Sequence, residues 1–258
     1  MLLSIVIPAY NEEKRLGASL QEIQTFLPNH FEQTEVIVVN DGSSDRTGQV
    51  VSSFVKQGGA HRIASIELAQ NSGKGAAVKA GVERATGDYI LFMDADLSTP
   101  LTEISKVLVP LQNGKDVAVG SRAIKSSNIL ERQPFYRESM GKLFNLFVRL
   151  LVINGISDTQ CGFKAFRREV AKEIFNRLET TRFGFDVEVL VWAKVLGYSV
   201  EEVGITWVNS PHSRVSPIRD SLEMLWSLFQ IRRRVYGVFK QSQKNRNLNV
   251  KYGEGSLR

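Results

Sequence analysis

Two carboxylates two positions apart, Asp94 and Asp96, directly follow the apolar stretch Tyr89–Met93. A pair of acids in an arbitrary loop is commonly just solvated, but here the preceding stretch has the composition of a buried strand. Carboxylate oxygens at the end of such a strand form a hard-oxygen site that suits Mg²⁺ or Mn²⁺ equally. A divalent ion there would bridge a diphosphate and neutralise a departing nucleoside diphosphate. The pair therefore predicts a metal site with Asp96 as a catalytic candidate.

Three further polar motifs follow predicted strands and suit nucleotide chemistry. Pro8 ends the first strand, and the polar residues after it begin a helix whose amides could face an anion, although they are also typical of a capped turn. Asp41 can accept hydrogen bonds from a base or a ribose. The glycines of the motif 71–75 allow close approach to a phosphate, and Lys74 supplies a point charge, but the spacing is not that of a Walker A loop.

The elements that must position these motifs alternate between short apolar runs and helical patterns. Such alternation predicts a doubly wound α/β sheet, in which ligands bind beyond the carboxyl ends of the strands. The expected strands are Leu3–Ile7, Glu35–Val39, Ile63–Leu68, Tyr89–Met93 and Asp116–Val119, and the expected helices lie at about 12–27, 45–57, 74–86 and 102–113. All four motifs fall at the carboxyl ends of these strands, so we expect them to meet in one site.

The second half of the chain is basic. Residues 1–130 carry 12 lysines and arginines against 14 acidic residues, whereas residues 131–258 carry 21 against 13. This asymmetry indicates an anionic partner for the second half. A nucleic acid is disfavoured, because there is no helix-turn-helix, zinc spacing or basic strand pair with interleaved aromatic residues. An anionic membrane surface and a phosphorylated substrate remain.

Two amphipathic segments in this half, at about 136–153 and 219–236, are expected to be helices. Either they pack on the core, or their apolar residues rest in a lipid interface beside basic residues. The apolar residues in question are Phe144, Phe147, Leu151, Trp226 and Phe229, and the basic ones are Lys142, Arg149 and Arg232–Arg234.

No apolar run approaches the roughly 20 residues that span a bilayer, which favours a soluble or peripheral protein. The single cysteine, Cys161, fits a reducing compartment. Residues 241–258 are polar and without periodicity, which predicts a flexible tail after one domain of residues 1–240.

With these motifs in order and at this spacing, the chain resembles family 2 glycosyltransferases of the GT-A fold. The motifs are PAYNEE, NDGSSD, NSGKGAA and DADLS, followed by Gly120-Ser121-Arg122, DTQCGFKAF and FGFDVE, so the resemblance covers about residues 3–215. DTQCGFK with FDVE about 20 residues later looks like the dolichyl-phosphate β-glucosyltransferases in particular. The resemblance implies a single α/β domain with a mixed, mostly parallel sheet flanked by helices.

The resemblance also implies roles for individual residues. The nucleotide-sugar would be bound by Pro8, Tyr10, Glu12, Asp41, Lys74, Asp94, Asp158 and Gln160, and the metal by Asp94 and Asp96. Asp96, Lys164 and Asp186 would be the catalytic residues, with Lys164 facing the donor sugar or diphosphate. Arg122, Arg132 and Arg137 are the candidates for the phosphate of the acceptor.

The expected reaction is metal-dependent, inverting transfer of a hexose onto a dolichyl or undecaprenyl phosphate at the cytosolic face of a membrane. A phosphate with a second pKa of about 6 is already deprotonated at neutral pH. We therefore expect Asp186 to serve site geometry and acceptor orientation more than proton abstraction. The donor is expected to be UDP-glucose, with GDP-mannose as the alternative, because the motifs do not fix the base. A non-lipid hydroxyl acceptor, or an inactive nucleotide-sugar or membrane-binding protein, also stays open.

Overall fold

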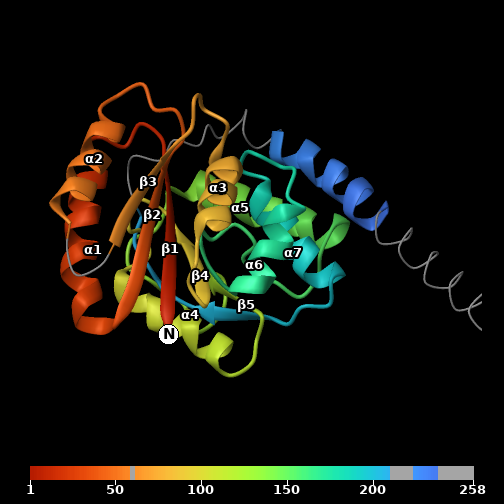
Figure 1. Cartoon of the computed structure of the whole chain (residues 1–258). Helices are drawn as coiled ribbons and strands as arrows, with labels where there is room; N and C mark the ends of the chain where they lie inside the picture. The colour runs from red at the N-terminus through yellow and green to blue at the C-terminus, as the bar shows by residue number, and fades with distance from the viewer. Residues whose placement is uncertain (59–61, 210–222, 238–258) are drawn as a thin grey trace, which may run out of the picture.

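The structure is a computed structural model that describes residues 1–58, 62–209 and 223–237 (Figure 1). Seven strands of this described part form one sheet in the order β3-β2-β1-β4-β7-β5-β8. Neighbouring strands are parallel except where β7 pairs with β4 and β5, to both of which it is antiparallel. The strands are β1 (Leu2–Ala9), β2 (Gln33–Asn40), β3 (Arg62–Glu67), β4 (Tyr89–Met93), β5 (Val117–Ser121), β7 (Phe163–Arg167) and β8 (Val200–Gly204), while β6 (Asn128–Ile129) pairs separately with β9 (Thr206–Trp207).

Helices cover both faces of this sheet, because side chains of successive strand residues point to opposite faces and most are apolar. One face packs against α1 (Leu16–His30), α2 (Thr47–Gln57) and α4 (Ile104–Gln112), which follows the 3₁₀ turn Leu101–Glu103. The other face packs against α3 (Lys74–Arg84), α5 (Phe135–Leu151), α6 (Arg168–Asn176), α7 (Phe185–Val195) and the helical residues 223–237. Within β4, for example, Phe92 faces the second group of helices and Leu91 the first.

The predicted α/β sheet with mostly parallel strands is confirmed, and the five predicted strands correspond to β1–β5. The helix expected from residue 12 begins at Leu16 instead. Residues 12–15 form a turn in which the amides of Arg15 and Leu16 both donate to the carbonyl of Glu12, at 3.0 and 2.9 Å. This turn carries Glu12 and Arg15 to the edge of the sheet where the strands end.

Residues 223–237 contact the C-terminal end of α5, because the Tyr236 hydroxyl donates to the carbonyl of Val152 at 2.8 Å and the Arg232 guanidinium donates to that of Leu151. A buried ion pair also fixes the second helix, since Arg234 Nη2 lies 2.7 Å from the fully buried carboxylate of Glu188 on α7. The rest of the second predicted amphipathic segment, and the tail predicted at 241–258, lie outside the described residues. No helix in the described part of the chain is long and apolar enough to cross a bilayer.

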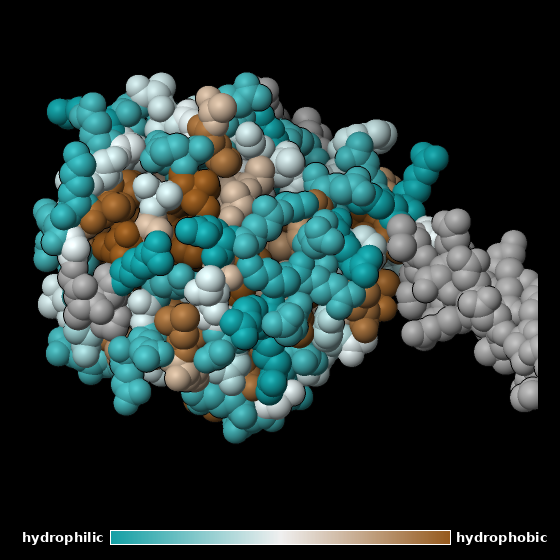
Figure 2. All heavy atoms as spheres, viewed as in Figure 1, coloured by the Kyte–Doolittle hydropathy of each residue, from teal (hydrophilic) through white to brown (hydrophobic). Residues whose placement is uncertain are grey.

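The exposed apolar residues differ from those named from the sequence on α5 but agree with them on the second helix. Phe144 is only 5% exposed and packs in the core with Val148, so for this residue the alternative of core packing is confirmed. Phe147 and Leu151 are partly buried against the same core. The exposed apolar residues of α5 are instead Leu143, Leu146 and Leu150, at 54, 43 and 69% exposure, and on the second helix they are Trp226 and Phe229, as expected. The view in Figure 2 is mostly hydrophilic, with apolar patches between the polar helices.

Candidate active site

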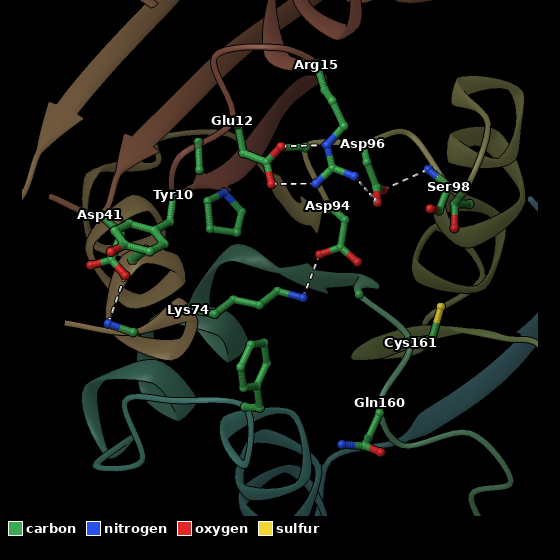
Figure 3. Close-up of a pocket in the computed structure, with 18 of the residues that line it drawn as sticks. Tyr10, Glu12, Arg15, Asp41, Lys74, Asp94, Asp96, Ser98, Gln160 and Cys161 are labelled. Atoms are coloured by element: carbon green, nitrogen blue, oxygen red, sulfur yellow. Dashed lines mark hydrogen bonds and ion pairs between the residues drawn. The ribbon is translucent and has the colours of Figure 1, made fainter. Parts of the chain in front are cut away.

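A cavity of about 430 Å³ opens where β1, β2 and β4 end, and residues of all four predicted motifs line it (Figure 3). Parallel strands bring their carboxyl ends to one edge of the sheet, so segments distant in the sequence meet there. Strand β7 begins at the same edge because it runs the opposite way, and its Phe163 pairs with Met93 of β4. The lining includes most of the predicted site residues: Pro8, Tyr10, Glu12, Asp41, Lys74, Asp94, Asp96, Arg122 and Gln160.

Asp94 lies between a lysine and a glycine. One of its carboxylate oxygens, Oδ1, is 2.6 Å from Nζ of Lys74. On its other side, a Cβ atom added to Gly162 would overlap the carboxylate, with Oδ2 as its nearest neighbour. Burial alone would lower the pKa of Lys74, but the negative charges of Asp94 and Asp186 outweigh burial and raise it. Lys74 is therefore a permanent cation in contact with the first carboxylate of the predicted metal site.

Asp96 is held by a different cation, Arg15. The Arg15 guanidinium donates to both carboxylate oxygens of Glu12, at 2.5 and 2.6 Å, and Nη1 lies 3.4 Å from Oδ2 of Asp96. The amide of Ser98 donates to Oδ1 of Asp96 at 3.1 Å. Hydrogen bonding to Glu12 raises the pKa of Arg15, which stays charged. Arg15 was not among the predicted site residues, because its position in the turn after β1 depends on where the helix begins.

Asp41 fixes the loop of residues 71–75, which was predicted to approach a phosphate. Its carboxylate accepts hydrogen bonds from the amides of Ser72 and Gly73, at 2.7 and 2.8 Å, and is 3% exposed. Burial raises the pKa of Asp41 although these two hydrogen bonds oppose the change. The residue predicted to contact the nucleotide thus also fixes the loop that leads to Lys74.

Arg122 and Asp158 form a bidentate pair at the far side of the cavity. Arg122 Nε and Nη2 donate to the two carboxylate oxygens of Asp158 at 2.7 and 2.9 Å, and the guanidinium lies over the Trp207 ring. Asp158 is 2% exposed and does not line the cavity, whereas Arg122 does. Of the other two acceptor candidates, Arg132 is exposed and outside the lining, and the side chain of Arg137 is outside the described part of the structure.

Lys164 and Asp186 lie one layer behind the cavity. The Lys164 side chain is fully buried beside Phe92, and its ammonium donates to the Asp186 carboxylate and, at 2.7 Å, to the carbonyl of Cys161. Neither Lys164 nor Asp186 lines the cavity. The pair instead holds the turn formed by Cys161 and Gly162, which meets Asp94. Burial raises the pKa of the Cys161 thiol to about 12, so this residue stays a neutral thiol at pH 7.

Several other lining residues were not predicted, and most come from segments without a recognisable pattern. Gly162 belongs to the DTQCGFK motif, yet only the contact with Asp94 reveals its importance. The remaining unpredicted lining residues include Ser98, Thr99, Gln133, Arg182, Phe183, Trp207 and Asn209. Ser98 and Phe183 belong to the motifs DADLS and FGFDVE, whereas the others come from segments far apart in the sequence that no local signal joins.

The donor set at the end of β4 fits a divalent ion that shares its ligands with a substrate. Within the described residues no group of three or more His, Cys, Asp or Glu side chains is placed to hold a metal. Asp94 and Asp96 supply carboxylate oxygens beside an open cavity. Mg²⁺ typically binds one or two carboxylates together with substrate phosphates, and Mn²⁺ also suits oxygen ligands. Two carboxylates are therefore sufficient when a diphosphate completes the shell.

The fold and this site define an α/β protein with a polar cavity beyond the carboxyl ends of its parallel strands. The sequence profile of glycosyl transferase family 2 matches residues 4–175. The chain belongs to this family and is a glycosyltransferase with the GT-A fold.

Curated relatives match nearly the whole chain. A dolichyl-phosphate beta-glucosyltransferase of Drosophila melanogaster is 38% identical over 89% of this chain and 74% of its own length. The enzyme of that name in Homo sapiens is 34% identical over 96% of this chain and 80% of its own length. Among solved structures, a glucosyl-3-phosphoglycerate synthase of Mycobacterium tuberculosis in complex with Mn²⁺, UDP-glucose and phosphoglyceric acid has a TM-score of 0.68, is 17% identical, and covers 92% of this chain and 80% of its own. That likeness shows the shared fold.

Proposed function

We propose that this enzyme transfers glucose from UDP-glucose, with inversion, onto a polyprenyl phosphate such as dolichyl or undecaprenyl phosphate. The observation that carries the proposal is the similarity to dolichyl-phosphate beta-glucosyltransferases, which extends over 89 to 96% of the chain in the two relatives described. The similarity includes the segment 158–164, whose glycine lies against Asp94 in the cavity.

The donor would lie across the ends of β1, β2 and β4, with its nucleoside near Pro8, Tyr10 and Asp41. Asp94 and Asp96 would hold a divalent ion, Mg²⁺ or Mn²⁺, which stabilises the negative charge that develops on the departing diphosphate. The Lys74 ammonium at the start of α3 lies beside the same position and would favour the anion further.

The acceptor phosphate would approach from the side of Arg122. The contact with Asp158 uses Nε and Nη2, which leaves Nη1 to be offered to a phosphate oxygen. Arg132 and Arg137 precede and begin α5, and we include them as contacts for the acceptor. A phosphate oxygen is already deprotonated at neutral pH, so in-line attack on the anomeric carbon needs orientation and no general base. In this proposal Lys164 and Asp186 position the 161–162 turn.

A polyprenyl tail stays in the bilayer, so the enzyme would bind to the cytosolic face of a membrane as a peripheral protein. The surface proposed for this contact, here called the interface face, consists of Leu143, Leu146, Leu150, Trp226 and Phe229. All five are exposed apolar residues on two adjacent helices, and the basic residues Lys142, Arg149 and Arg233 are exposed on the same two helices. Basic side chains beside an apolar helix face favour anionic lipid surfaces.

The test is transfer of labelled sugar into the lipid phase. Purified protein is incubated with Mg²⁺ or Mn²⁺, a polyprenyl phosphate in detergent, and labelled UDP-glucose or GDP-mannose in parallel. Label from UDP-glucose, with a β-linked product by NMR, is expected. Label from GDP-mannose alone would show that the donor is GDP-mannose and not UDP-glucose. Hydrolysis of the donor without label in the lipid phase would refute the proposal that a polyprenyl phosphate is the acceptor.

The matched variants are Asp96→Asn and Glu22→Gln, since Glu22 is an exposed acid on α1. Asp96→Asn is expected to lower turnover at least 100-fold, or about 2.7 kcal/mol, by weakening the stabilisation of the leaving group. Glu22→Gln is expected to behave as the unmodified enzyme. Full activity in the presence of EDTA would refute the proposed dependence on a divalent metal ion.

A further inference from the structure

Lys74 lies where a divalent ion would have to bind. Its ammonium extends into the cavity and contacts Oδ1 of Asp94 at 2.6 Å (Figure 3). The lysine side chain is 21% exposed and the aspartate side chain 40% exposed, so the pair is reachable from the cavity but not fully solvated. An ammonium on a ligand oxygen occupies one of the positions that a metal ion would take.

The backbone on both sides of Lys74 is held against the segment that leads into α7. A Cβ atom on Gly73, whose φ is +102°, would lie 2.5 Å from the carbonyl oxygen of Thr181. A Cβ atom on Gly75 would lie 2.6 Å from that of Thr180. The amide of Ala76 also donates to the Thr181 carbonyl at 3.1 Å. Because the chain is anchored on both sides, the origin of the Lys74 side chain is fixed and only its flexible stem can move.

Gly162 borders the Asp94 carboxylate on one side. The second oxygen of Asp94, Oδ2, lies against Gly162, where even a methyl group would not fit. Oδ1 is the oxygen that the ammonium already contacts, so a metal ion bound to Oδ1 would lie beside the positive charge of Lys74. Two cations on one carboxylate oxygen repel each other, and the repulsion is strong where solvent is partly excluded. Asp96 differs, because its cation Arg15 lies at 3.4 Å and is bound to Glu12 by shorter contacts.

A nucleoside diphosphate would resolve this conflict. Lys74 is the first residue of α3, and the amides of a helix start favour an anion at the same place. The lysine stem is long enough to turn from Asp94 towards such an anion, and an ammonium is a compact cation that phosphate oxygens accept from several directions. The diphosphate supplies negative charge for the lysine and further oxygen ligands for the metal.

We propose that, in the metal-free protein, the Lys74 ammonium takes the place of the metal ion and neutralises the charge of Asp94. When metal and donor bind, the ammonium moves from Asp94 to the nucleoside diphosphate. This inference rests on the proposed metal site at Asp94 and Asp96. It makes binding of the metal depend on the nucleotide, and by thermodynamic reciprocity binding of the nucleotide depends on the metal to the same degree.

The test is direct titration of Mn²⁺, followed by calorimetry and by the EPR signal of free Mn²⁺, with and without UDP. The full-length protein is compared with Lys74→Met, with Lys74→Gln as a second variant should the first fold poorly, and with the control Lys14→Met. Lys14 is an exposed lysine whose replacement changes the net charge equally. Melting temperatures by circular dichroism check folding.

We expect Lys74→Met to bind Mn²⁺ alone at least tenfold more tightly than the unmodified protein, since the competing cation is gone. UDP is expected to strengthen Mn²⁺ binding strongly in the unmodified protein and in Lys14→Met, and at least tenfold less in the Lys74 variants. Equal Mn²⁺ affinity in all variants without UDP, or an unchanged effect of UDP, would overturn the inference and leave the proposed function intact. Absence of Mn²⁺ binding to the unmodified protein even with UDP would overturn both.

Discussion

At the scale of single residues, the site depends on one glycine as much as on its carboxylates. Gly162 lies so close to Asp94 that the carboxylate occupies the space of a missing side chain. The motif DTQCGFK therefore contributes through what is absent at its fifth position. The adjacent Cys161 is buried and carries a thiol with a raised pKa, so it adds shape rather than reactivity.

Gly162→Ala is expected to lower turnover at least 100-fold, because the added methyl group displaces Asp94 and small misplacements of reacting groups have large effects on rate. The free energy of unfolding should change by no more than about 2 kcal/mol, since Asp94 can rotate into the open cavity. The control is Gly141→Ala in α5, where nothing lies within 4 Å of the new methyl group. Normal turnover in Gly162→Ala would contradict this role.

Variants of the buried pair Lys164 and Asp186 are expected to change stability and turnover separately. Lys164→Met leaves a buried carboxylate without its cation, which typically destabilises a protein by about 3–5 kcal/mol. The double variant Lys164→Met/Asp186→Leu should regain most of that stability in urea denaturation. Its turnover should stay low, because no ammonium then holds the Cys161 carbonyl. Equal stability of the single and double variants would argue against the pair.

At the scale of elements, the apolar strands and the order of the motifs were predictable, whereas β7 was not. Its sequence, Phe163–Arg167, has a lysine at the second position, and a lysine in a short apolar run argues against a buried strand. The lysine is tolerated there because Asp186, distant in the sequence, supplies its partner. The amphipathic pattern of α5 predicted a helix but did not decide which apolar residues face outward, because Phe144 and its neighbour Leu143 are both apolar and only the first is buried.

The interface face gives the prediction for this scale. The triple variant Leu146→Gln/Leu150→Gln/Trp226→Gln is expected to reduce binding to vesicles that contain anionic lipid at least tenfold, measured by flotation, because less apolar surface enters the lipid. The control is Val109→Gln, since Val109 is 50% exposed on α4, which covers the opposite face of the sheet. Unchanged flotation of the triple variant would show that these residues do not meet the membrane.

At the scale of the whole molecule, the Arg122–Asp158 pair couples the site to acid stability. Burial alone would raise the pKa of Asp158, but Arg122 outweighs it and lowers the pKa below the ordinary value of 3.8. A carboxylate whose pKa is lower in the folded state contributes stability that is complete above the unfolded pKa and is lost as the pH falls towards the folded pKa. This pair therefore stabilises the fold fully near neutral pH and progressively less from about pH 5 downward.

Asp158→Asn should remove this contribution. The free energy of unfolding, from urea denaturation between pH 3 and pH 7, is expected to fall by about 2–4 kcal/mol at pH 7, because Arg122 loses its bidentate partner. The difference from the unmodified protein should narrow below about pH 5. A difference that stays constant over the whole range would show that Asp158 does not titrate with folding.

The order of the strands has a consequence for how the chain is made. Strand β7 separates β4 from β5 in the sheet, although β5 precedes it in the sequence. During synthesis, β5 emerges with neither of its partners, and β4 has one open edge until residues 163–167 follow. From the end of β4 at Met93 to the end of β7 at Arg167 the chain grows by 74 residues, which takes about 4–15 s at roughly 5–20 residues per second. An open apolar strand edge is prone to pair with other chains, so the nascent enzyme is expected to depend on chaperones at this stage. The proposed donor site forms only when the antiparallel strand β7 pairs between β4 and β5.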